Sequence, residues 1–177
     1  MRTLRLSLLT FLVALAIVLA TAQSTLAATK AEAPTSDGGI ERAIRHYRST
    51  TLELRGVMGV PSRFPTLGHV GLRRAWSIWH RRAAAAKHVF SRGPAHRLAW
   101  LCIHRYEGSW TDGGSPYYGG LQMDVGFQET YGRALFAAKG TADHWTPLEQ
   151  MWVAERAYRS GRGFYPWPNT ARYCGLI

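Results

Sequence analysis

Residues 102–124, CIHRYEGSWTDGGSPYYGGLQMD, join a helical pattern to a loop rich in glycine and aromatic residues. The preceding segment, AHRLAWLCIHRYE at 95–107, predicts a helix that ends where the glycines begin. Trp100, Ile103 and Glu107 are spaced i, i+3 and i+7, so they share one face of that helix. The pattern therefore predicts a carboxyl group at the end of an apolar helix face, directly before an aromatic loop.

The predicted surroundings of Glu107 suit a carboxyl group that stays protonated. An apolar face desolvates the carboxyl, the negative end of the helix dipole disfavours its charge, and aromatic neighbours exclude water. All three effects raise its pKa, and cleavage of a glycosidic bond needs such an acid beside the leaving oxygen. The alternative is an exposed glutamate, or one paired with His104 or Arg105, and position alone leaves both readings open.

Two more helices are predicted after the loop. Phe127, Tyr131 and Leu135 recur at helical spacing and predict a helix from near Asp124 to Gly140.

The clearest helix start in the chain is TPLE at 146–149. Thr146 is placed at the N-cap, Pro147 at the first helical position and Glu149 at the third, which forms a capping box. This helix is expected to run to Gly161. The tail, GFYPWPNTARYCGLI, is aromatic and proline-rich and is expected to wrap over the domain.

The N-terminal part of the chain divides into three segments. Residues 1–27 are basic, then apolar, then small, which predicts a secretory signal peptide. A retained membrane anchor is the alternative, because the uncharged run is long enough to cross a bilayer. The protein is thus expected to be secreted, or membrane-anchored if uncleaved. Residues 28–40 predict a flexible linker, and residues 41–94 a basic, partly helical segment.

The positive charge lies mainly in one half of the chain. Residues 41–106 carry 13 Lys and Arg against 2 Asp and Glu, whereas residues 107–177 carry 6 against 7. The basic half is expected to attract polyanions. Outside a cell these are anionic wall polymers or a membrane surface, and no nucleic acid is expected because no recognised module accompanies the arginines.

Other enzyme classes lack their motifs here. The seven histidines are scattered without H-E-x-x-H spacing, and no G-x-S-x-G segment occurs. No metal or other cofactor is expected, and the protein is expected to be a monomer.

The chain has two cysteines, Cys102 and Cys174. An even count in an exported protein favours a disulfide bond between them, with two buried free thiols as the alternative.

From about residue 96 to the end, the chain carries a series of short motifs in order. They are Trp100 seven residues before Glu107, EGSW at 107–110, YYGGLQ at 117–122, EQMWVAERAY at 149–158, and Trp167-Pro168 before the late cysteine. Together they resemble the transglycosylase-like domain of actinobacterial resuscitation-promoting factors, a small relative of lysozyme and the soluble lytic transglycosylases.

The resemblance implies a mainly α, lysozyme-like (α+β) domain over residues 95–177, with a substrate cleft and a short irregular or β-like loop region. It implies cleavage of peptidoglycan glycan strands at the β-1,4 bond between N-acetylmuramic acid and N-acetylglucosamine. Glu107 would act as general acid and then general base. The implied substrate-binding residues are Tyr117, Tyr118, Gln122, Asp124 and Gln150. Alternatives remain open for them: packing for the tyrosines, backbone bonding for Gln122, and helix capping for Asp124.

The chain also departs from the family pattern. Tyr106 stands where the family has a cysteine, and Cys102 lies one helical turn earlier on the same face. EGSW is two residues shorter than its family counterpart, and Phe127 replaces a threonine that contacts substrate. A non-catalytic wall-binding protein, with the same cleft and a basic segment for adhesion, is therefore the alternative function.

Overall fold

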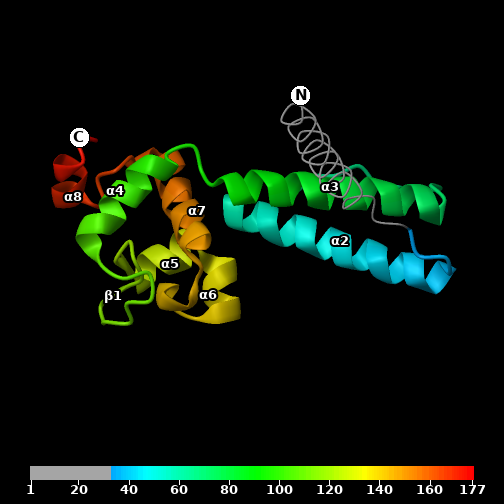
Figure 1. The fold of residues 1–177 in the computed structure, drawn as a ribbon, viewed down its shortest axis with the longest axis horizontal. Helices are drawn as coiled ribbons and strands as arrows, with labels where there is room; N and C mark the ends of the chain where they lie inside the picture. The colour runs from blue at the N-terminus through cyan, green and yellow to red at the C-terminus, as the bar shows by residue number, and fades with distance from the viewer. Residues whose placement is uncertain (1–32) are drawn as a thin grey trace, which may run out of the picture. The chain divides into compact units, whose positions relative to one another are not determined.

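The computed structural model describes residues 33–177, so the predicted signal peptide and the start of the predicted linker lie outside the described residues. The protein is mainly helical, as predicted, with one two-stranded antiparallel sheet. The elements are α2 (Asp37–Met58), α3 (Leu72–Arg92), α4 (Arg97–Glu107), β1 (Tyr117–Tyr118), β2 (Met123–Asp124), α5 (Val125–Tyr131), α6 (Arg133–Lys139), η2 (Ala142–His144), α7 (Pro147–Ala157), the π-helical turn η3 (Tyr158–Arg162) and α8 (Pro168–Tyr173) (Figure 1).

Helix α2 begins inside the predicted linker. The Ser36 hydroxyl accepts a hydrogen bond from the Gly39 amide at 3.2 Å, and Asp37 places a negative charge in the first turn. The linker prediction is therefore wrong for residues 37–40, because this cap starts the helix early. Thr35–Ile177 form one compact unit, which includes both the basic segment and residues 95–177.

Helices α2 and α3 pack side by side and run in the same direction (Figure 1). Asp37 and Leu72, at the N-terminal ends of the two helices, border one surface hollow. Further along the pair, the ring centres of Tyr47 and His80 are 5.0 Å apart. The irregular segment 59–71 must therefore return along the pair from the end of α2 to the start of α3.

The C-terminal end of α2 is held by two arginines, one in α7 and one in η3. Arg156 donates to the Gly56 carbonyl at 3.3 Å, and Arg159 donates to the Met58 carbonyl. Cationic donors stabilise the free carbonyls at a helix C-terminus. Burial, and then the neighbouring charge of Arg159, lower the pKa of Arg156.

Helix α7 lies at the centre of the core formed by the C-terminal half. It begins with the predicted capping box, in which Thr146 and Glu149 satisfy each other's backbone amides at 2.8 and 3.3 Å. The helix ends at Ala157 and continues to Arg162 as a π-helical turn rather than as α-helix. The core residues packed around it include Trp100, Ile103, Leu121, Met123, Trp145 and Trp167.

The single helix predicted from near Asp124 to Gly140 is instead two helices, α5 and α6, separated at Gly132. The ring of Trp145 packs against Gly132, where a β-carbon would lie only 2.5 Å from it. Tertiary packing thus interrupts a helix that local spacing makes continuous.

The predicted disulfide bond joins Cys102 in α4 to Cys174 directly after α8, across 72 positions of sequence. On the chain-entropy model a loop of this size stabilises the folded protein by about 4 kcal/mol. The bond therefore holds the C-terminal tail against α4. Within residues 33–177, no helix combines the length and apolar character needed to cross a bilayer.

Candidate active site

Glu107 is the last residue of α4 and is partly buried. Its Oε1 accepts a hydrogen bond of 2.7 Å from the hydroxyl of Thr170, which lies on α8 and is 7% exposed. Within residues 33–177, Oε2 has no hydrogen-bond partner. One carboxyl oxygen is thus fixed by the protein, and the other is free to carry a proton or to meet a ligand.

Glu107 borders an open hollow of about 210 Å³ that three segments of the chain form together. α4 contributes Glu107, and the β1–β2 hairpin and the C-terminal tail contribute the other lining residues: Tyr117, Gln122, Pro166, Trp167, Pro168 and Asn169. Pockets that enclose a small ligand usually measure about 300–1,000 Å³. A smaller, open hollow suits part of a longer molecule that continues across the surface.

The tail wall of the hollow is fastened to the hairpin by Trp167. Its indole nitrogen donates to the Leu121 carbonyl at 2.6 Å, and its buried ring packs on Trp100 and Phe127. Phe127, predicted to replace a substrate-contacting threonine, is a core residue here.

The hairpin wall depends on a tight turn at residues 119–122, closed by a hydrogen bond from the Gln122 amide to the Gly119 carbonyl. Gly119 has φ +73°, and a β-carbon there would meet Gln150 at 2.5 Å. Gln122 has φ +47°, an uncommon value for a residue other than glycine. The turn therefore imposes an unusual backbone on a side chain that lines the hollow.

The amide group of Gln122 is oriented by two acceptors. Its Nε2 donates to Asp112 Oδ2 at 2.8 Å and to the Gly119 carbonyl at 3.0 Å, so both amide hydrogens are used. The remaining polar atom, Oε1, is an acceptor. Asp112 and Gln122 both lie against Gly108, where a β-carbon would be 3.1 Å from each, so this pair is directly beside Glu107.

The position of Gln150 contradicts its predicted role in saccharide binding. It was expected to bind a saccharide, but its side chain is fully buried. Its Oε1 accepts from the Gly120 amide at 2.9 Å, and the two hydrogens of its Nε2 are shared among three carbonyls, those of Trp110 (2.8 Å), Ala142 (2.8 Å) and Trp145 (3.1 Å). Gln150 therefore supports the hairpin turn from behind and does not reach the hollow.

The two predicted tyrosines point to opposite faces of the hairpin, as neighbouring strand residues do. Tyr117 is half exposed and lines the hollow, whereas Tyr118 packs against the core. Asp124 pairs with Tyr117 in the sheet register and caps α5, accepting from the Phe127 amide at 2.7 Å. The structure thus brings Glu107, Tyr117 and Gln122 together, leaves Asp124 at the edge of the hairpin, and removes Tyr118 and Gln150 from the hollow.

Sequence reasoning missed Thr170 and Asn169 and could not place Asp112. The signal for the first two was present, since Trp167-Pro168 starts a short helix just before the bridging Cys174. Their approach to Glu107 follows from the fold of the tail, which local patterns do not reveal.

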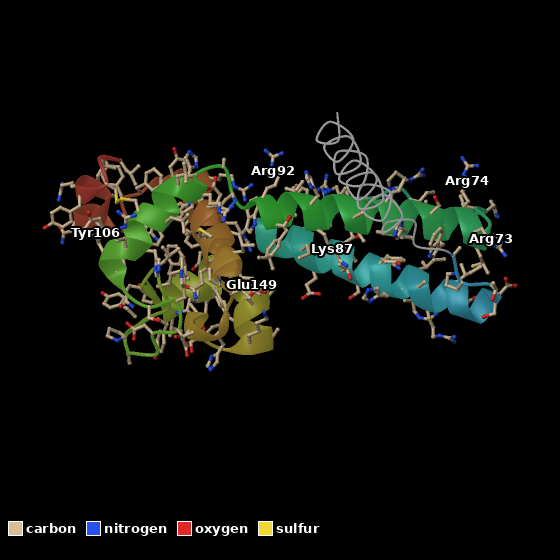
Figure 2. All side chains as sticks on the ribbon, in the orientation of Figure 1. Arg73, Arg74, Lys87, Arg92, Tyr106 and Glu149 are labelled. Carbon is tan, nitrogen blue, oxygen red and sulfur yellow. A yellow bond between two sulfur atoms is a disulfide. The ribbon has the colours of Figure 1, made fainter. Side chains whose placement is uncertain are left out.

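Tyr106, the residue before Glu107, lies beside α8 (Figure 2). The centre of its exposed ring is 5.7 Å from the centre of the Tyr173 ring. This contact is a second link between α4 and the C-terminal tail, one helical turn from the disulfide bond. Among residues 33–177, no group of three or more His, Cys, Asp and Glu is arranged to hold a metal ion.

No protein-family model, curated protein or solved structure matches this chain.

We predict unequal losses of stability for Gln122, in the hairpin turn, and Gln150, which supports that turn from α7. Gln150→Leu removes the side-chain partner of the Gly120 amide and of the Trp110 and Trp145 carbonyls, whereas the Ala142 carbonyl still accepts from the Trp145 amide. Each buried group left unpaired costs about 1–3 kcal/mol, so the free energy of unfolding should fall by about 3 kcal/mol or more. Gln122→Leu, at the surface of the hollow, should cost about 1 kcal/mol. Urea unfolding followed by circular dichroism measures both. Equal, small losses would contradict the structural role of Gln150.

Proposed function

We propose that the protein cleaves the glycan strands of peptidoglycan at the β-1,4 bond between N-acetylmuramic acid and N-acetylglucosamine, as a lytic transglycosylase or muramidase. The observation that carries the proposal is Glu107 at the edge of an open hollow, with one oxygen bonded by a buried hydroxyl and the other available. The motif resemblance of residues 96–177 supports the same reaction and a lysozyme-like fold for this part of the chain.

Glu107 would supply the proton in the first step. With Oε1 bonded to Thr170, the transferable proton resides on Oε2 and passes to the glycosidic oxygen as the bond to the anomeric carbon breaks. The resulting carboxylate keeps the Thr170 hydrogen bond, which stabilises its charge. It then acts as the base that takes a proton from the group attacking the sugar.

The second step needs a nucleophile other than Glu107. Asp112 is engaged by Gln122 and by the Gly114 amide at 3.1 Å, so it acts as a positioning residue rather than as an attacking group. The substrate's own N-acetyl group or 6-hydroxyl would take this role, giving hydrolysis or a 1,6-anhydro end respectively. Gln122, held with Oε1 as its acceptor, would bind a sugar hydroxyl or amide N–H.

The cellular location forms part of the proposal. A disulfide bond is typical of exported proteins and supports secretion to the wall through residues 1–27, or membrane attachment if that segment is retained.

Glu107→Gln removes the transferable proton with little change of shape, so we predict loss of activity by at least about 100-fold, the lower range for general acid–base catalysis. The measurement is clearing of purified cell walls, with mass spectrometry of the released muropeptides. Anhydro and reducing ends differ by one water, which identifies the product type.

The alternative function has a distinct result in this assay. If the protein only binds the wall, both the wild type and Glu107→Gln would sediment with the walls, and neither would clear the wall suspension. Equal clearing by both forms would show that Glu107 is not the acid.

Thr170→Val keeps the shape of a buried side chain but removes the hydrogen bond to Glu107. A hydrogen bond to a charged group is worth about 1.5–3 kcal/mol, so clearing should slow by about tenfold or more. Thr170→Ser keeps the hydroxyl and serves as the matched control, with a rate within about threefold of wild type. Identical rates for the two variants would remove Thr170 from the mechanism.

A further inference from the structure

A second hollow lies away from Glu107, between the α2–α3 pair and the segment that returns along it. It measures about 280 Å³. Its lining combines one guanidinium group, two hydroxyl groups and an apolar wall: Arg48, Leu52, Ser62, Phe64, Pro65, Thr66, Leu67 and Trp79.

Three guanidinium groups lie over the two aromatic rings at this hollow. Arg48 lies 5.9 Å from the centre of the Trp79 ring, and Arg55 lies 5.1 Å from that of Phe64. Arg82 is near both rings, at 4.7 and 4.5 Å. A cation over an aromatic ring is attracted by the ring and uses no hydrogen-bond acceptor in doing so. Arg55 also donates to the Pro61 carbonyl.

These arginines have no acidic partner among the described residues. Residues 37–92 carry 11 Lys and Arg against 3 Asp and Glu, and the ion pair found within them joins Arg45 to Glu41. Arg55 Nε and Arg82 Nη1 are buried and lack a hydrogen-bond partner within residues 33–177. Neither of these two side chains lines the hollow, so they contribute to its positive charge and not to its donors. Uncompensated charge costs free energy, which a bound anion would recover.

We infer that this hollow binds a phosphate diester of a polyol. Arg48 supplies charged donors for the phosphate oxygens, Ser62 and Thr66 supply neutral donors, and the wall of Leu52 and Trp79 covers the carbon chain.

Such diesters occur both in wall polymers of the glycerol-phosphate type and in lipid headgroups. Further arginines project from α3, with Arg73 and Arg74 near its start and Arg92 at its end, and add to the positive charge of this part of the chain (Figure 2). The inference is independent of the activity proposed for Glu107. Binding here would hold the protein at the wall or membrane and raise its effective concentration there.

The test uses the full exported chain and the small diester glycerophosphoglycerol, measured by calorimetry at 0.1 M salt. Arg48→Gln should weaken binding by about tenfold or more, because a charge-assisted hydrogen bond is lost. Thr66→Val should weaken it several-fold without a change of charge. Arg73→Gln is the matched control, since it removes the same charge outside the hollow, and should leave the affinity within about twofold.

Two further probes identify the source of the ligand. Poly(glycerol phosphate) and phosphatidylglycerol vesicles are compared with polyglutamate, a carboxylate polymer. If the protein binds one of the two phosphate probes, and Arg48→Gln weakens that binding, the result supports the site and identifies the source of its ligand. Absence of binding to the diester, equal loss in Arg48→Gln and Arg73→Gln, or equal affinity for polyglutamate would each overturn the inference. Thermal unfolding of each variant controls for folding, and Thr66→Val keeps the test decisive if Arg48→Gln is unstable.

Discussion

The return of the C-terminal tail to the end of α4 is the constraint on which the candidate active site depends. The Cys102–Cys174 bond fixes this return covalently, and the hydrogen bond from Thr170 to Glu107 places it at the carboxyl group. Trp167 then fastens the same tail to the hairpin through the Leu121 carbonyl. Without these contacts the hollow would lose its second wall, since four of its seven lining residues come from the tail.

The opposite wall rests on one buried amide. Gln150 bonds the Gly120 amide, the Trp110 carbonyl and two carbonyls at the ends of η2, so it ties the hairpin turn to α7 and η2. In front of this support, Asp112 holds Gln122 with its amide oxygen as an acceptor beside Glu107. A catalytic site requires polar groups that are already oriented and backbone that holds them rigidly, because such groups need not reorganise during the reaction. The oriented amide of Gln122 and the supported hairpin turn meet this requirement beside Glu107.

The helical content, the capping box of α7 and the disulfide bond could be predicted from the sequence, because each follows from local spacing or from cysteine count. The roles of the two glutamines could not. Gln122 and Gln150 both lie within motifs of the resemblance. Only the packing of α7 behind the turn distinguishes the residue that lines the hollow from the residue that is buried as a support. Thr170 could not be predicted either, because its contact with Glu107 spans 63 residues and depends on the path of the tail.

The central claim is that Glu107 stands within reach of the scissile glycosidic oxygen of a bound glycan strand. A crystal structure of Glu107→Gln with an alternating N-acetylglucosamine–N-acetylmuramic acid oligomer tests it most directly. We expect a glycan across the hollow, in contact with Tyr117 and Gln122, and with the glycosidic oxygen about 2.6–3.2 Å from the residue 107 side chain. A glycan bound at another surface, with residue 107 facing only solvent, would contradict it.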